Sequence, residues 1–177
     1  MKINIFAEGS GTKQEDTEIP FREFYQGSFL TVSNLIDQLY EYGDIQLHIL
    51  SEEFGLVRGE ENVDRHIPQS DAIDENQGEF LRKILEKAAD ADVVIILLSS
   101  SKFDSLIVKN WKDITERAKP NSVWCLGAAR SSLEVIDFEP LYQIGCEIIT
   151  YQRVGVARID NETRKDLMRK IEVLQSK

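Results

Sequence analysis

Hydrophobic residues fall along the chain in short blocks that alternate between a strand-like and a helix-like pattern. The block at 93–98 is apolar throughout, as in a central parallel strand that is covered on both faces. Between the strand-like blocks, apolar residues recur every three or four positions, as on one side of a helix. This alternation predicts a single three-layer α/β/α domain over residues 1–177, Rossmann-like, with a mostly parallel sheet of about five strands. The expected strands are 3–7, 45–50, 93–98, 123–126 and 146–151.

The helical pattern is less regular than the strand pattern. The polar segment 51–78 is too long for an ordinary loop, so we expect it to contain a short helix or to form a lid. The expected helices run from Pro20 to Gly43 with an interruption at Gly27 and Ser28, over 80–88, over 103–118, within 133–144, and from Asp160 or Asn161 to the final apolar positions.

Composition narrows the class of protein. The chain has 42% hydrophobic and 29% charged residues, and its formal net charge is -10. This charge argues against extended binding to duplex nucleic acid, which depends on basic contacts to phosphate. No apolar run approaches the roughly 20 residues of a membrane span, and the start lacks the apolar stretch of a signal peptide. We therefore expect a cytoplasmic protein without a membrane partner.

Cysteine and histidine are too few, and too far apart, for a zinc site. We expect Cys125 and Cys146 to be reduced core residues, His48 to be a hydrogen-bonded sheet residue, and His66 to face solvent. No metal ligands are assigned, and the sequence specifies no cofactor.

A ligand site is expected at the carboxyl ends of the strands, where the strand order reverses. The first strand borders this point in both common strand orders, so the loop from Gly9 to Lys13 is best placed. Its glycines let backbone N–H groups turn inward and Lys13 adds a positive charge, which favours an anion such as phosphate over a merely flexible loop. The candidate ligand-binding residues are Gly9, Ser10, Gly11, Thr12, Lys13, Gly55, Arg58, Ser99, Ser100, Lys102, Arg130 and Ser131.

Three residues after the second strand are candidates for catalysis. Beside Ser51, Glu52 or Glu53 offers a general base, or a nucleophile for an N-glycosidic bond. Adjacent side chains at a strand end point in different directions, so at most one carboxylate is expected to face the site. A solvated acidic turn is the alternative interpretation.

Three segments resemble a prokaryotic and viral domain family of unknown function. They are Gly9-Ser10-Gly11-Thr12-Lys13, Phe24-Tyr25-Gln26-Gly27-Ser28-Phe29 and Leu50-Ser51-Glu52-Glu53-Phe54-Gly55-Leu56, and the last is similar to the family pattern Leu-Ser-Ala-Lys-Tyr-Gly-Leu. The same element resembles one in the YaaA peroxide-stress family and in domains associated with deazaguanine modification of nucleic acids. Here Glu52-Glu53 replaces the usual Ala-Lys, and the Cys usually found in the first strand is absent. The resemblance implies nucleobase or nucleic-acid chemistry.

A second resemblance is to nucleoside deoxyribosyltransferase-like folds, carried by Ala91-Asp92 before an apolar strand. The leading hypothesis is a domain that binds a nucleotide-like or nucleobase-like ligand and acts on its N-glycosidic bond. The alternatives are a non-catalytic binding or sensor module, and a homo-oligomeric protein that buries exposed apolar residues such as Trp111 or Trp124. Catalysis itself is left open.

Overall fold

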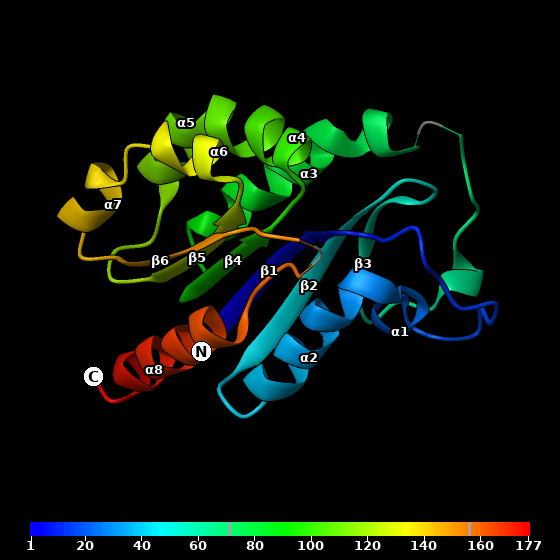
Figure 1. The fold of residues 1–177 in the computed structure, drawn as a ribbon, viewed down its shortest axis with the longest axis horizontal. Coiled ribbons are helices and arrows are strands. Elements are labelled where there is room, and N and C mark those ends of the chain that lie inside the picture. Colours follow the sequence, from blue (N-terminus) through cyan, green and yellow to red (C-terminus); the bar gives the residue numbers. More distant parts are fainter. Residues whose placement is uncertain (71, 156) are drawn as a thin grey trace.

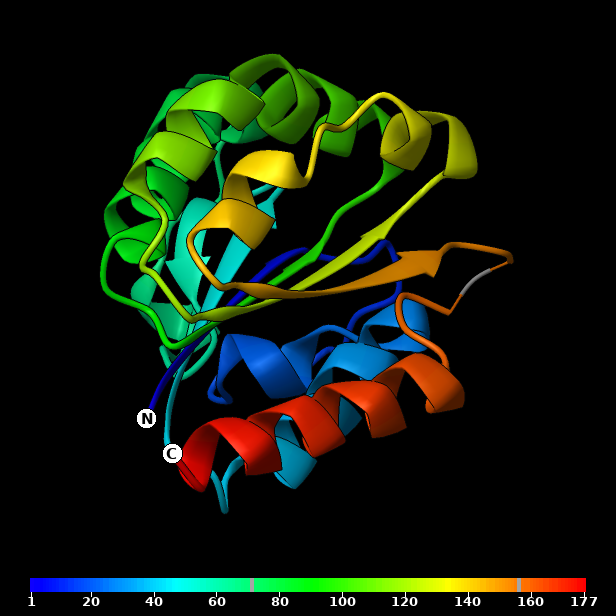
Figure 2. The ribbon, with the colours of Figure 1, turned by 90° about the vertical axis from the view of Figure 1, so that its left-hand side faces the viewer.

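A computed structural model describes residues 1–70, 72–155 and 157–177. Six strands form one sheet in the order β3-β2-β1-β4-β5-β6, in which only β3 is antiparallel to its neighbour. Helices lie on both faces of this sheet (Figures 1 and 2), so the architecture is the expected three-layer α/β/α class. The strands are β1 Lys2–Glu8, β2 Asp44–Ser51, β3 Gly55–Arg58, β4 Val93–Leu97, β5 Val123–Ala128 and β6 Glu147–Gln152.

The two faces of the sheet have separate hydrophobic cores. Odd-numbered residues of β1 pack with α2 (Leu30–Leu39) and α8 (Asn161–Gln175), whereas Phe6 of β1 packs with α3 (Ala72–Ala88) and α5 (Trp111–Arg117). Figure 2 shows α2 and α8 together on one side of the sheet. The α-helices are α1 Phe21–Phe24, α2 Leu30–Leu39, α3 Ala72–Ala88, α4 Ser100–Lys102, α5 Trp111–Arg117, α6 Arg130–Glu134, α7 Glu139–Gln143 and α8 Asn161–Gln175. Short 3₁₀ turns at η1 Gly27–Phe29, η2 Val63–Arg65 and η4 Val108–Asn110, and a π turn at η3 Phe103–Ile107, complete the order.

The five predicted strands are all present, and β3 is an additional short strand. The helix expected over 103–118 is present but irregular, because this segment consists of a π turn, a 3₁₀ turn and α5 in succession. The interruption near Gly27 is confirmed, since α1 ends at Phe24 and a 3₁₀ turn precedes α2. Asp160 caps α8 as expected, where its side chain accepts a hydrogen bond from the Thr163 backbone N–H.

The two cysteines and the two tryptophans are all buried. Both cysteines are buried and free, as expected. Trp111 and Trp124 are not available for a dimer interface, because both are buried in the core between α5 and the sheet. Within the described residues, no helix is long and apolar enough to cross a membrane.

Candidate functional site

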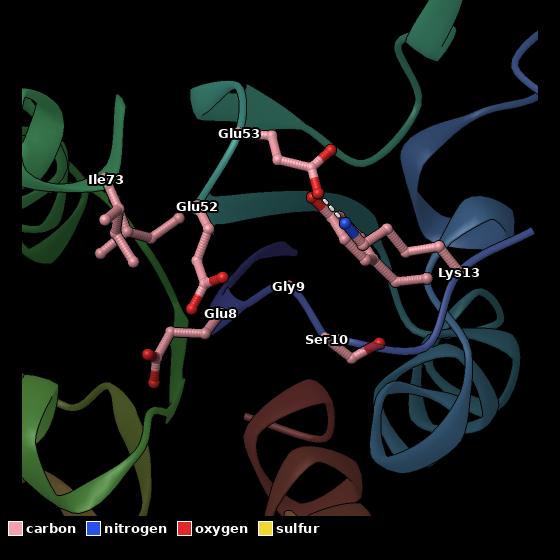
Figure 3. Close-up of a pocket in the computed structure, with 10 residues that line it drawn as sticks. Glu8, Gly9, Ser10, Lys13, Glu52, Glu53 and Ile73 are labelled. Atoms are coloured by element: carbon pink, nitrogen blue, oxygen red, sulfur yellow. Dashed lines mark ion pairs between the residues drawn. The ribbon is translucent and has the colours of Figure 1, made fainter. Parts of the chain in front are cut away.

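The strand order reverses between β1 and β4, because β2 follows β1 on one side and β4 pairs with it on the other. All the strands except β3 are parallel, so their carboxyl ends share one edge of the sheet. A cavity of about 90 Å³ lies at this edge, beside the ends of β1 and β2 (Figure 3). Its lining residues are Glu8, Gly9, Ser10, Gly11, Lys13, Tyr25, Leu50, Glu52, Glu53 and Ile73. We call this cavity the strand-end pocket.

The loop after β1 has a defined conformation. The Gly9 backbone N–H donates to the Leu50 carbonyl at 3.1 Å, which extends the pairing of β1 with β2. Further along, Gln14 and Gln26 donate to the carbonyls of Phe24 and Thr12, both at 2.8 Å. The loop is therefore held against the start of the first helical segment, in contrast to the alternative of a flexible, solvated loop.

Close packing of Tyr25 explains why glycine occupies position 9. A β-carbon on Gly9 would lie 2.6 Å from the Tyr25 ring, which is closer than side chains pack. The Tyr25 hydroxyl forms a buried hydrogen bond of 2.6 Å with Ser51 Oγ. Burial raises the pKa of Tyr25, and the nearby Glu52 carboxylate contributes in the same direction, so the phenol remains protonated at neutral pH. Ser51 thus supports the pocket wall through Tyr25 and does not line the cavity.

The two adjacent glutamates both line the pocket, so the expectation that at most one would face it is wrong. Their side chains nevertheless diverge (Figure 3), and Glu53 extends toward Lys13 while Glu52 extends toward Glu8. Lys13 and Glu53 form an ion pair. Glu52 forms no ion pair with any residue that the structure describes.

Glu8, the last residue of β1, connects the end of β1 to the end of β4, where the strand order reverses. Its carboxylate accepts a hydrogen bond from the Ser99 backbone N–H, directly after β4. The pocket lining contains three carboxylates and one ammonium group, all named above. Because Glu53 already neutralises Lys13, the pocket is acidic and its one lysine is not free to bind an anion. This arrangement does not favour the anion expected from the sequence.

A buried arginine fixes the same loop from behind, and sequence reasoning missed it. Arg158 precedes α8 and is 5% exposed. Its guanidinium donates to the Glu8 and Gly9 carbonyls and lies near Ser28 Oγ. Burial lowers the pKa of Arg158 to about 10, which leaves it charged at neutral pH. No local motif identifies this residue, because it lies 150 positions from Glu8.

The other predicted site residues lie outside the lining of the strand-end pocket. Gly55 begins β3 in a left-handed conformation, and Thr12 faces Gly27. Ser99 is joined to the pocket by its backbone N–H, which donates to the Glu8 carboxylate. Ser100 and Lys102 lie in α4, and Lys102 is 3.9 Å from Asp74. Arg130 and Ser131 lie in α6, where the largely exposed Arg130 pairs with Glu134 at 2.6 Å.

Arg58 lies on β3, where it pairs in register with His48 and forms an ion pair with Glu60. The long segment 51–78 that contains it includes a short 3₁₀ helix at η2, which is one of the two expectations for it. Its residues 61–64 pair with the segment 17–21, through hydrogen bonds such as that from the Val63 N–H to the Ile19 carbonyl. His66 packs against Phe21 and lies 3.2 Å from Glu61, so it is only partly exposed.

Metal binding by a carboxylate cluster finds no support in the described part of the chain. No group of three or more His, Cys, Asp or Glu side chains is placed to hold an ion there. The candidate chemistry of the strand-end pocket is therefore that of carboxylate acceptors, one of which, Glu52, is unpaired.

Comparisons with known proteins give structural matches alone. No protein-family model matches the chain, and no curated protein matches it. A flavodoxin from Streptococcus pneumoniae TIGR4 aligns over 99% of both chains with 11% identity and a TM-score of 0.46. A flavodoxin-like domain from Synechococcus sp. aligns over 98% of this chain and 96% of its own, with 10% identity and a TM-score of 0.43. We draw no functional conclusion from matches this distant.

Proposed function

We propose that the strand-end pocket binds the sugar part of a nucleoside-like ligand. The observation that carries this proposal is the unpaired Glu52 carboxylate, which lines the pocket beside Glu8. Carboxylate oxygens accept hydrogen bonds but cannot donate them, so the pocket favours a group rich in hydroxyl donors. Because Lys13 is paired with Glu53, a phosphate group gains little here, and a nucleoside fits the charges better than a nucleotide does.

The size of the pocket supports partial enclosure of the ligand. A cavity of about 90 Å³ is well below the roughly 300–1,000 Å³ of sites that enclose a whole drug-sized ligand. A sugar group would enter, and the nucleobase would lie outside, along the strand edge toward β4. The Ser99 segment borders that side, because its backbone N–H contacts Glu8.

The chemistry that we propose for this complex is cleavage of the N-glycosidic bond. Glu52 would attack the anomeric carbon, and the bonding electrons would leave with the nucleobase, which takes a proton from solvent. Water would then hydrolyse the glycosyl ester and regenerate the Glu52 carboxylate. Glu53 is less suited to this role because Lys13 engages it.

A non-catalytic binding module is the second candidate. It is favoured because Glu8, Lys13 and Glu53 are all engaged in contacts within the protein. In that case the pocket would bind the same ligand class without releasing a nucleobase, so binding and turnover must be measured separately.

Thermal unfolding with a panel of nucleosides, nucleotides and free ribose tests binding. A ligand at 100 times its Kd adds about 2.7 kcal/mol to the free energy of unfolding, which raises the Tm of a chain this size by roughly 5–10 °C. We expect Glu52→Gln to reduce this rise and the control Glu116→Gln, an exposed residue of α5, to leave it unchanged. The proposal fails if no nucleoside raises the Tm, or if Glu52→Gln responds as the wild type does.

Chromatographic detection of released nucleobase then separates the two candidates. Release that requires Glu52 supports N-glycosidic cleavage. Binding without release supports the non-catalytic module. Release that continues in the Glu52→Gln variant would contradict the role given to this residue.

A further inference from the structure

The outer edge of β2 is only partly covered by β3. The four residues of β3 pair with residues 48–51 of β2, and the chain after Gly59 contacts α1 instead. Among the described strands, the first half of β2, residues 44–47, therefore pairs with β1 alone. We call residues 44–47 the open edge of β2. An uncovered strand edge presents backbone N–H and C=O groups that can pair with another chain.

Two backbone hydrogen bonds show which groups face outward at the open edge. The Asp44 N–H donates to the Met1 carbonyl at 2.8 Å, which places the backbone groups of Asp44 on the β1 side. The Leu47 carbonyl accepts from the Gly59 N–H at 2.9 Å on the opposite side. Because the backbone groups of successive residues alternate between the two edges of a strand, the N–H and C=O of Ile45 face outward.

A cavity of about 280 Å³ follows the open edge. Residues 44–47 all line it, together with Ile36 of α2 and Tyr40, the residue after α2. Successive strand side chains point to opposite faces, so a cavity that borders four consecutive residues lies along the edge and not over one face. A second cavity, of about 260 Å³, borders Asp44 and Gln46 and reaches Lys87 of α3. A strand added here would therefore find space for side chains toward both faces.

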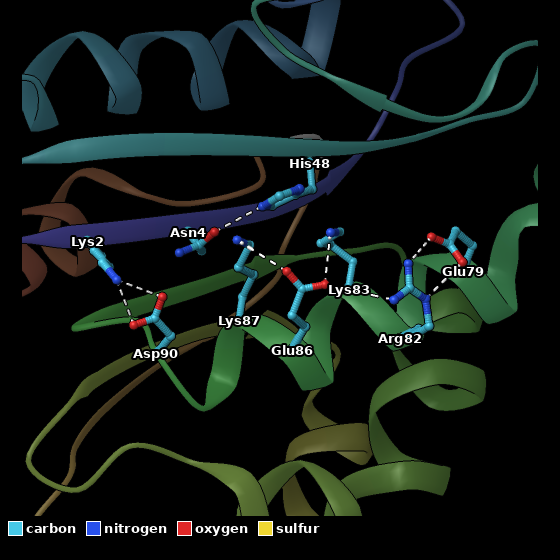
Figure 4. Close-up of polar contacts among 9 residues, drawn as sticks. All are labelled: Lys2, Asn4, His48, Glu79, Arg82, Lys83, Glu86, Lys87 and Asp90. Atoms are coloured by element: carbon cyan, nitrogen blue, oxygen red, sulfur yellow. Dashed lines mark hydrogen bonds and ion pairs between the residues drawn. The ribbon is translucent and has the colours of Figure 1, made fainter.

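Unpartnered polar atoms also border the open edge. In residues 1–70, 72–155 and 157–177, three buried side-chain polar atoms have no hydrogen-bond partner, and two of them, Gln46 Oε1 and Arg58 Nε, belong to residues that line the larger cavity. The third is Nδ1 of the buried His48, whose Nε2 lies 2.9 Å from Asn4 Oδ1 (Figure 4), so this is the hydrogen-bonded sheet residue expected from the sequence. An unpartnered buried atom is destabilising. The larger cavity thus favours an occupant with both a donor and an acceptor.

The charges along the open edge indicate which side chain this occupant carries. Each cation that lines the two cavities has a carboxylate within 4.0 Å, and Figure 4 shows two of these pairs; the four are Lys2–Asp90, Lys87–Glu86, Arg58–Glu60 and Arg22–Asp37. Asp44 is exposed, lines both cavities and forms no ion pair with any described residue. An ammonium group has three donors, so one lysine can bind Asp44 and also Gln46 Oε1, two positions along the same face.

We propose that the open edge of β2 binds an extended segment of a partner protein, which adds a strand to the sheet and places a lysine at Asp44. The added backbone pairs with the N–H and C=O of Ile45. Its next side chain points to the other face, beside Ile36 and Tyr40, which favours an apolar residue next to the lysine. The net charge of -10 also favours a basic partner. The open edge is at the start of β2 and the strand-end pocket at its end, so either proposal can fail alone.

Nuclear magnetic resonance of the backbone amides tests this interaction. The probe is a capped peptide, Lys-Val-Lys-Val-Lys-Val, titrated into ¹⁵N-labelled full-length protein at constant pH and ionic strength. We expect the Ile45 amide resonance to move and saturate, and its hydrogen exchange to slow, because the added strand accepts its N–H. The amide of Ile5, a buried residue of the inner strand β1, serves as the internal reference. An Ile45 amide that neither moves nor gains protection would overturn the proposal.

Matched controls separate strand pairing from simple charge attraction. A peptide of the same sequence, N-methylated at alternate residues, keeps its charge but cannot pair as a strand, so we expect it not to bind. Asp44→Asn should weaken binding by about fivefold, the upper value for an exposed ion pair. Asp113→Asn, at an exposed residue of α5, should leave it unchanged.

Three results would refute the assignment. They are binding of the N-methylated peptide, equal binding of Glu-Val-Glu-Val-Glu-Val, and wild-type affinity in Asp44→Asn. Light scattering adds a separate check on the occupant. If the protein alone is a dimer in which the Ile45 amide is already protected from exchange, a second copy of the chain occupies the open edge, and the partner proposed here is wrong.

Discussion

The buried hydrogen bond between Tyr25 and Ser51 connects the first helical segment to the end of β2, and its removal should weaken the wall of the strand-end pocket. Tyr25→Phe deletes only the hydroxyl and keeps the ring that packs against Gly9. Because the pair is neutral and buried, we expect a loss of about 1 kcal/mol in the free energy of unfolding.

This loss converts into a measurable shift in melting temperature. With an unfolding entropy of about 2.1 cal/mol/K for each of the 177 residues, 1 kcal/mol corresponds to roughly 3 °C. Calorimetry or thermal unfolding followed by circular dichroism can measure the shift. Tyr142→Phe is the matched control, because Tyr142 is 54% exposed and should show no shift.

Ser51→Ala should be more damaging than Tyr25→Phe. Ser51 Oγ also lies 3.3 Å from the Glu53 backbone N–H and 3.1 Å from that of Phe54, so its loss leaves several donors without a partner. We expect a cost of about 2–3 kcal/mol, and a double-mutant cycle with Tyr25→Phe should give a coupling near 1 kcal/mol. Additive effects, or a Tyr25→Phe variant as stable as Tyr142→Phe, would refute this account of the pocket wall.

Two further predictions concern backbone strain and pH. Gly55 has a φ of 71° and an added β-carbon would lie 2.4 Å from Asn76, so Gly55→Ala should destabilise the protein by about 1–3 kcal/mol in urea unfolding. Gly78→Ala, in open space on α3, should stabilise it by about 0.5–1 kcal/mol. If both variants change the free energy of unfolding in the same direction, this reasoning is contradicted. Burial lowers the pKa of His48 from 6.5 to about 3, so the unfolded chain binds a proton that the folded chain does not, and stability falls as pH drops from 6.5 toward 3. The loss at about pH 4 should be roughly 3 kcal/mol, and His48→Leu should lack this part of the pH dependence.

The five parallel strands could be predicted from the sequence because each is a short block of apolar, or alternating apolar and polar, residues between polar segments, and the sheet buries its apolar positions. The run at Val93–Leu97 is fully buried on both faces, as its composition indicates. The four-residue strand β3 escaped prediction because Gly55–Arg58 is too short to show a strand pattern of its own and is formed by pairing with the end of β2. Strand order, too, is set by packing between distant segments and leaves no local signal.

Part of the strand-end site could also be predicted from the sequence. Glycines and polar residues after β1 and β2 do line one cavity, because parallel strands bring their carboxyl ends together. What the sequence does not reveal is which charges neutralise each other. Lys13 lies 40 positions from Glu53, yet the two form an ion pair. Arg130 forms an ion pair with Glu134, one helical turn away. The expected anion site therefore becomes an acidic pocket.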